Sequence, residues 1–243
     1  MTVRSSLFAA GLLAAGVAVA GAFVGWGFWQ GREAPRVVSV KGLAERPVSA
    51  DLALWPLRFV ATGDSLAEVQ AVITADAATV RDFLETNGIG SGEIQVKGLE
   101  VIDVLAQPYR SGPVDVRFIV AQTLLVRSTE VQRVFEASQK VGDLVNQGVV
   151  ISSEDMAGGS APIFLFTRLN DVKPAMIAEA TANARATADQ FARDSGSRLG
   201  AIQTASQGLF QILPRDPAPG IMEERQIDKT LRVVTTVDYR LTD

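Results

Sequence analysis

Five residues, Gly88-Ile89-Gly90-Ser91-Gly92, could in principle cradle a phosphate group. Glycine-rich loops bind phosphate when they follow a strand and precede a helix, because the amides at the helix N-terminus then face the anion. Here the glycines come after a helical pattern and before a strand pattern. The sequence therefore favours a helix C-terminus and a connecting loop over a phosphate site.

A loose cation site is the second chemical candidate. Glu154 and Asp155 stand close to Gly158 and Gly159, and carboxylate oxygens are ligands that hard cations accept. The segment lacks the regularly spaced carboxylates of an EF-hand, so it is predicted to be a solvated acidic loop. The sequence thus assigns no catalytic, cofactor-binding or metal-binding residue.

Composition removes most other catalytic chemistry. The 243 residues include no Cys and no His, which excludes thiolate nucleophiles, Cys/His zinc sites and a Ser-His-Asp triad. The net charge of −4 does not favour nucleic acid as a partner, because phosphate binding needs a basic face. We expect a protein that is not an enzyme and takes no cofactor. Two alternatives stay open: an enzyme that uses only carboxylate, Lys or Ser groups, and a module that binds a small periplasmic ligand between helix and sheet.

The strongest pattern in the chain is an uncharged apolar run over residues 7–29. A helix of that length covers roughly 34 Å, enough for a hydrocarbon core of about 30 Å. Trp26 and Trp29 suit the membrane–water interface. We expect a transmembrane anchor in contact with the lipid bilayer, although Ala18-Val19-Ala20 resembles the cleavage site of a secretory signal peptide.

Gly21 and Gly25 form a GxxxG motif within this run. Such a motif lets two membrane helices approach closely, and glycine is also common in membrane helices without that role. The chain is therefore divided into an N-terminal tail (1–6), the anchor (7–29), a polar linker (30–36) and a folded domain (37–243). The folded domain is large enough to divide into two lobes, with a break near Ser128.

Beyond the linker, the residue pattern predicts an α+β fold. Two strands and a helix recur three times and two strands close the domain, so the order is ββα repeated three times plus a final ββ. The last strand alternates apolar and polar residues, which indicates antiparallel sheets with one buried face, and we expect helices packed on that face. The predicted strands are 37–41, 51–61, 94–106, 114–127, 145–151, 163–167, 201–213 and 230–241.

The predicted helices follow the second, fourth and sixth strands. Apolar residues recur at intervals of three and four from Leu66 to Leu84 and from Val131 to Val141. The third helix carries Pro174 in its first turn, where the missing N–H costs nothing, and ends at Gly196. Its many alanines predict close packing.

Two places suggest a contact with another subunit. Trp55 and Pro56 lie in an apolar strand, and a proline there indicates an edge strand or a bulge. An edge strand is where a second subunit can add. Tyr109 lies at the tip of a predicted hairpin and is a further candidate, so the protein is expected to be a homo-oligomer.

Charged residues near the end of the chain are predicted to be solvated. Glu223-Glu224-Arg225 and Asp228-Lys229 follow the turn-rich segment 214–220. They are interpreted as the exposed charges of a hairpin.

Several motifs, taken in order, resemble the SIMPL-domain family. The resemblance covers residues 36–243, nearly the whole part after the linker, and rests on order and spacing because no single motif is specific. Leu43-Ala44 departs from it, since many members have a second glycine there, and the membrane-length N-terminal run departs from the shorter members. The matching motifs are Val38-Ser39-Val40-Lys41-Gly42, Asn87-Gly88-Ile89, Pro108-Tyr109, Gly142 to Val149, and Phe191 to Gly200.

The resemblance implies a bacterial envelope protein. Bacterial members are secreted or envelope proteins, often periplasmic, which fold as an α+β domain of βαβ-like units and can assemble into ring-like or channel-like oligomers. Some are linked to oxidative-stress tolerance, and an animal relative binds a signalling kinase, but the family supplies no catalytic residues. For this chain it implies a single-pass protein of the inner (cytoplasmic) membrane with its folded domain in the periplasm, an unknown protein partner and an indirect link to stress tolerance.

Overall fold

The computed structural model describes residues 14–26, 36–106, 115–152 and 160–243. The fold is α+β, with helices packed on two four-stranded sheets. The described chain forms two compact units, each built from separate segments. Unit 1 contains the described residues up to Leu43, Ala180–Gly208 and Thr235–Asp243, and unit 2 contains Ala44–Glu179 and Leu209–Val234. Ser128 lies inside unit 2, so the division does not fall there.

One sheet has the strand order β1-β8-β6, and β7 also pairs with β8. In this sheet β1 and β8 are antiparallel, because Arg36 O accepts from Leu241 N while Ala50 N donates to Ile227 O. Both strands run through the two units, and the antiparallel β6 pairs with the part of β8 in unit 1. The strands are β1 (Val37–Ser49), β6 (Arg198–Gln207), β7 (Gln211–Pro214) and β8 (Asp228–Thr242).

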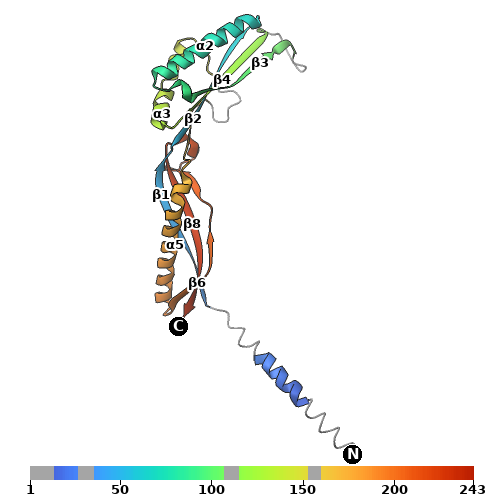
Figure 1. Ribbon diagram of the computed structural model, residues 1–243, viewed down its shortest axis with the longest axis vertical. Helices are drawn as coiled ribbons and strands as arrows, with labels where there is room; N and C mark the ends of the chain where they lie inside the picture. The colour runs from blue at the N-terminus through green and yellow to red at the C-terminus, as the bar shows by residue number, and fades with distance from the viewer. Residues whose placement is uncertain (1–13, 27–35, 107–114, 153–159) are drawn as a thin grey trace, which may run out of the picture. The chain divides into compact units, whose positions relative to one another are not determined.

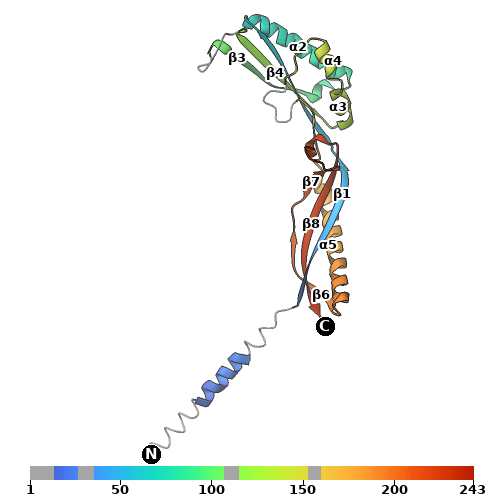
Figure 2. The ribbon, with the colours of Figure 1, turned by 180° about the vertical axis from the view of Figure 1, so that it is seen from behind.

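The predicted alternation in the last strand is confirmed. Leu231, Val233, Thr235, Val237 and Tyr239 are buried, whereas the residues between them are partly exposed. Helix α5 (Leu169–Asp194) lies along β1 and β8 in both views (Figures 1 and 2). The sheet therefore has one face covered by this helix and one face open to solvent.

The alanines of α5 make its close packing possible. In unit 1, Ala184 and Ala188 pack with Val40, Val237 and Tyr239 in one buried cluster. The helix begins at Leu169, earlier than predicted, so Pro174 lies in the second turn instead of the first. Gly196 ends the helix region with a φ of 70°, as predicted, because glycine accepts this conformation without a steric penalty.

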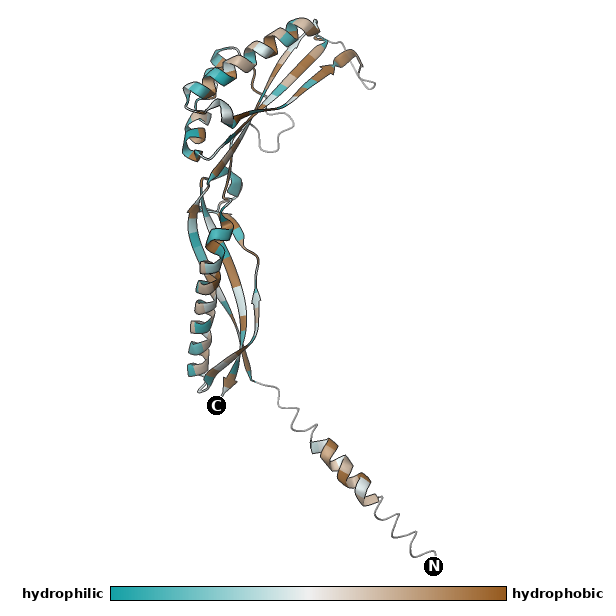
Figure 3. Cartoon of the chain, viewed as in Figure 1, coloured by the Kyte–Doolittle hydropathy of each residue, from teal (hydrophilic) through white to brown (hydrophobic). Residues whose placement is uncertain are grey.

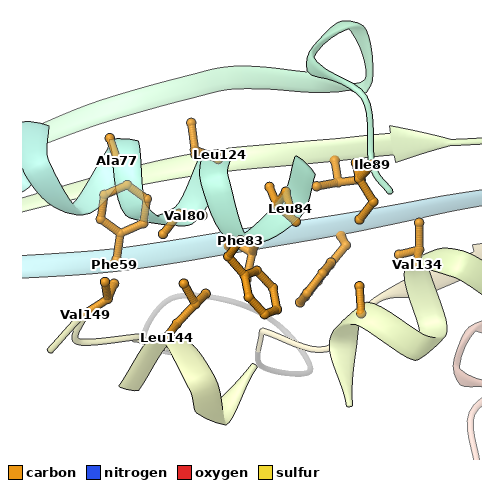
Figure 4. Packing of buried hydrophobic residues seen from close by; sticks show 14 of the residues in the cluster. Phe59, Ala77, Val80, Phe83, Leu84, Ile89, Leu124, Val134, Leu144 and Val149 are labelled. Carbon is orange, nitrogen blue, oxygen red and sulfur yellow. The ribbon is translucent and has the colours of Figure 1, made fainter. Parts of the chain in front are cut away.

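The other sheet, with the order β3-β4-β2-β5, belongs to unit 2. Its strands β2, β3, β4 and β5 pair antiparallel. Three helices cover one face, and side chains from helices and strands meet in one apolar core (Figure 4). The elements are β2 (Leu52–Gly63), α2 (Leu66–Thr86), β3 (Ile94–Asp103), β4 (Phe118–Ser128), α3 (Val131–Ser138), α4 (Gly142–Asn146) and β5 (Ile163–Leu165).

The predicted order ββα is confirmed for the first two repeats, whereas the third repeat and the final strand pair differ from it, as does the pairing of the first two strands. The first two strands do not form a hairpin: β1 continues to Ser49 and pairs with β8, while β2 pairs with β4 and β5. Residues 145–151 form the end of α4, a turn at Gly148 (φ 91°) and a single bridge at Ile151. Residues 201–213 divide into β6 and β7. The local pattern predicts that strands adjacent in the chain pair with each other. In the structure, strands far apart in the chain pair because that arrangement buries their apolar faces.

The apolar N-terminal run is helical over residues 14–26. Among the described residues, no helix combines the length and the apolar character needed to cross a membrane. Three short 3-10 helices, η1 (Ser91–Glu93), η2 (Val104–Ala106) and η3 (Glu223–Arg225), complete the described elements.

Candidate functional site

Asp51, between β1 and β2 in unit 2, is an acidic side chain with both carboxylate oxygens hydrogen-bonded. Its Oδ1 accepts hydrogen bonds from Thr167 N and Thr167 Oγ1, both at 2.9 Å. Its Oδ2 accepts from Arg168 N at 3.3 Å and from Arg168 Nε at 3.1 Å. The carboxylate therefore holds the two residues that precede α5, which explains why this helix begins at Leu169.

The same bonds control the ionisation of Asp51. Burial by itself raises the pKa of its carboxyl, but the hydrogen bonds from Thr167 and Arg168 outweigh burial and leave the pKa below its ordinary value. Because the folded pKa is lowered, the ionised carboxyl stabilises the fold above its unfolded pKa of about 3.9. That stabilisation is lost as the pH falls through the folded pKa.

Asp51→Asn should therefore lower the free energy of unfolding by about 1–2 kcal/mol at pH 7. The asparagine amide has one oxygen that can accept hydrogen bonds, whereas the carboxylate has two. Urea unfolding at a series of pH values measures the difference from the unmodified protein. We expect the difference to shrink between pH 5 and pH 3. A difference that stays constant over that range would show that the charge of Asp51 contributes nothing.

Asp51 borders a groove of about 800 Å³ in unit 2, which we call the junction groove. It lies where β1 meets β2, β4 meets α3 and β5 meets α5, and its charged groups are three acids and one arginine. Two of these, Asp51 and Arg168, already pair with each other. In the described part of the chain, no group of three His, Cys, Asp or Glu side chains could hold a metal ion. The groove is lined by Val48–Asp51, Thr129, Glu130, Phe166–Arg168, Asp171 and Val172.

The prediction that Lys229 is a solvated charge is wrong. Its side chain is fully buried in β8. Its Nζ pairs with a carboxylate oxygen of Glu223 and donates to Glu223 O at 2.6 Å. The signal was present in the alternation of β8, because Lys229 is in phase with the buried Leu231 and Val233.

A second recess in unit 2 has aromatic walls, and we call it the aromatic pocket. Its volume is about 320 Å³. Phe135 from α3 and Phe164 from β5 stand with ring centroids 6.3 Å apart and planes at 58°. The rest of the lining consists of Trp55, Ser138, Gln139, Val141, Ser160, Ala161, Pro162 and Arg225.

Trp55 and Pro56 do not lie on an edge strand, because β2 pairs with β4 on one side and β5 on the other. Trp55 is buried and its indole N–H donates to Ser160 O at 2.7 Å. On the β5 side, pairing stops after Leu54 and resumes where Ser152 N donates to Arg58 O. Pro56 falls between them, where no ladder donor is required, and the subunit contact inferred from an edge loses its premise.

The glycine-rich segment after α2 acts as a helix end. Gly88 has a φ of 82°, and Arg133 Nη1 donates to its carbonyl oxygen at 3.1 Å. The backbone N–H of Gly90 donates to Glu93 Oε2 at 2.9 Å. These bonds are internal to the fold, which agrees with the predicted cap and loop.

The remaining predicted positions are spread over the N-terminal helix and the segments outside the described residues. Trp26, Gly21 and Gly25 lie on the helix over residues 14–26, where the space beside both glycines is open. Four positions lie outside the described residues: Trp29, Tyr109, Glu154 and Asp155. Of the predicted contact residues that the structure describes, Gly21, Gly25 and Trp26 share the N-terminal helix, and Trp55 and Pro56 share β2.

A family profile matches most of the chain. The profile of the SIMPL family, described as a protein of unknown function (DUF541), matches residues 38–239. No curated protein matches the chain. The matched region includes β1, both sheets and nearly all of β8, so this chain belongs to the SIMPL family.

Proposed function

We propose that this protein is a non-enzymatic, membrane-tethered envelope protein that acts by assembling with further copies of itself. The folded domain would stand in the periplasm, with residues 7–29 in the inner (cytoplasmic) membrane. A role in oxidative-stress tolerance would be indirect, because a chain without cysteine has no thiol to cycle.

The tether is supported by the surface of the helix over residues 14–26. Its large apolar side chains, Val17, Val19, Phe23, Val24 and Trp26, are all exposed, and every other residue from 14 to 26 is Ala or Gly. Figure 3 colours much of this helix as hydrophobic. A helix that is apolar on every side needs an apolar environment. The uncharged run of 7–29 is long enough to supply a full membrane crossing.

Assembly is supported by one observation, the exposed apolar edge of the sheet in unit 2. On β3, Val96 is 57%, Leu99 50% and Val101 48% exposed. Val96 pairs with Leu124 and Val101 with Val120, so they share the face that carries the fully buried core of β4. The helix layer covers β2 and β4 and leaves these side chains open.

The charges around this edge favour a second copy as the partner. Glu100 of β3 pairs with Arg58 at 3.1 Å, and Asp103 pairs with Arg117 at 3.0 Å. The acids of β3 are thus paired within the chain and add little repulsion where two copies meet at this edge, which leaves Lys97 as the other charged residue of the strand. An apolar patch that meets its own copy makes a symmetric contact.

Single-cysteine crosslinking in membranes tests this contact, and the absence of native cysteine makes the chemistry specific. Val96→Cys should give a dimer with a short bismaleimide. Ala67→Cys on the exposed side of α2 should give at least tenfold less dimer. Equal yields from the two variants, or no dimer from either, would contradict assembly through β3.

A further inference from the structure

We propose that the aromatic pocket is a binding site for a small, uncharged, planar aromatic molecule of about the size of indole. The proposal depends on unit 2 alone. It is independent of the membrane tether and of the contact through β3. The binding site can therefore fail its test while the proposed function holds, and the proposed function can fail while the binding site holds.

The size and walls of the pocket carry the first part of the argument. Its volume of about 320 Å³ lies at the lower end of the range for small-molecule sites, roughly 300–1,000 Å³. Trp55, Phe135 and Phe164 come from three different elements and leave a recess between them instead of closing it. Aromatic rings favour offset or tilted neighbours at 4.5–7 Å between centroids, so a flat ring can extend the Phe135–Phe164 pair.

Exposure at the mouth of the pocket points the same way. Phe135 is 37% exposed, although it lies on the short helix α3 beside the fully buried Val134. A planar ligand would cover this ring and remove apolar surface from water, which favours binding. Trp55, which also lines the pocket, is buried and held in place by its hydrogen bond to Ser160 O, so the pocket is formed before a ligand arrives.

The polar groups of the lining argue for a neutral ligand. Arg225 Nη1 donates to Ala161 O at 2.8 Å and to Pro162 O at 3.0 Å. Ser138 Oγ donates to Phe135 O at 2.7 Å. A charged ligand would lose its hydration and would have to compete with these internal bonds, which is costly, whereas an apolar ring leaves them intact.

Fluorine NMR of Trp55 tests the proposal directly. Trp55 is the one tryptophan of the chain outside the N-terminal run, so the variant Trp26→Phe/Trp29→Phe labelled with 5-fluorotryptophan gives a single resonance. We expect indole, added to the full chain in lipid nanodiscs, to shift that resonance with half-saturation at or below about 1 mM free indole. A shift that rises linearly without saturation would overturn the proposal.

Two filling variants and one charged probe make the test specific. Ala161→Leu and Ser138→Leu each place extra bulk in the pocket and should weaken indole binding at least tenfold, and either variant that keeps the circular dichroism of the fold is sufficient. Ala67→Leu, on exposed α2, should bind as the unmodified protein does. Unchanged indole binding in a folded filling variant, or equally tight binding of indole-3-acetate, would contradict a site for neutral rings here.

Discussion

Gly42→Ala should destabilise the protein by about 3 kcal/mol, at the upper end of the cost of overpacking a core. A Cβ at this position would lie 1.8 Å from Ala180 O and 2.6 Å from Ala184 N. Both neighbours are backbone atoms of α5, so no side chain can rotate away. To accept the methyl group, β1 and α5 would have to separate, and the buried contacts of Ala184 and Ala188 would be lost.

The midpoint and slope of urea unfolding measure this effect, followed by circular dichroism. Gly92→Ala in η1 is the control, because nothing lies within 4 Å of a Cβ at that position and it is outside the proposed contact through β3. The control should stay within about 0.5 kcal/mol of the unmodified protein. Equal stability of the two variants would show that β1 and α5 do not pack as closely as described.

The second large effect is expected at the buried ion pair of β8. Glu223→Gln should cost about 3 kcal/mol, because it leaves the Lys229 ammonium buried without its counter-charge. Lys229 is fully buried and in the pair only Glu223 keeps some exposure. Lys229→Met should cost about 1 kcal/mol or less, because it removes the buried positive charge itself. Glu223 then has no buried charge to neutralise.

A double-mutant cycle separates this explanation from a general loss of packing. The Glu223→Gln/Lys229→Met variant should be close in stability to Lys229→Met alone and more stable than Glu223→Gln. Glu130→Gln removes one partner of the exposed Arg133–Glu130 pair and should change stability by less than about 0.5 kcal/mol. Additive losses in the double variant would mean that the pair is not coupled.

The sequence predicted what local periodicity can determine. The two-residue repeat of β8 identified its buried face, and the small residues of α5 indicated a helix packed close to the sheet. Extended back by two residues, the same repeat would have placed Lys229 on the buried face. The charge of Lys229 outweighed that signal, because lysine is rarely buried without a partner.

Partners far apart in the chain could not be predicted from local patterns. β1 was expected to pair with β2, yet its partner β8 lies at the other end of the chain. The aromatic pocket is built from Trp55, α3, the segment around Phe164 and Arg225, and no spacing in the sequence indicates that these four meet. The stretch 145–151 shows the ambiguity of short apolar runs, which suit a buried helix as well as a strand.

The mass of the crosslinked Val96→Cys product from washed membranes tests the central claim, tethered assembly, most directly. The claim predicts a species of two chains that both retain residues 1–29, recovered from the membrane fraction. A single chain in the soluble fraction, beginning after residue 20 and carrying only unpaired crosslinker, would contradict both the tether and the assembly.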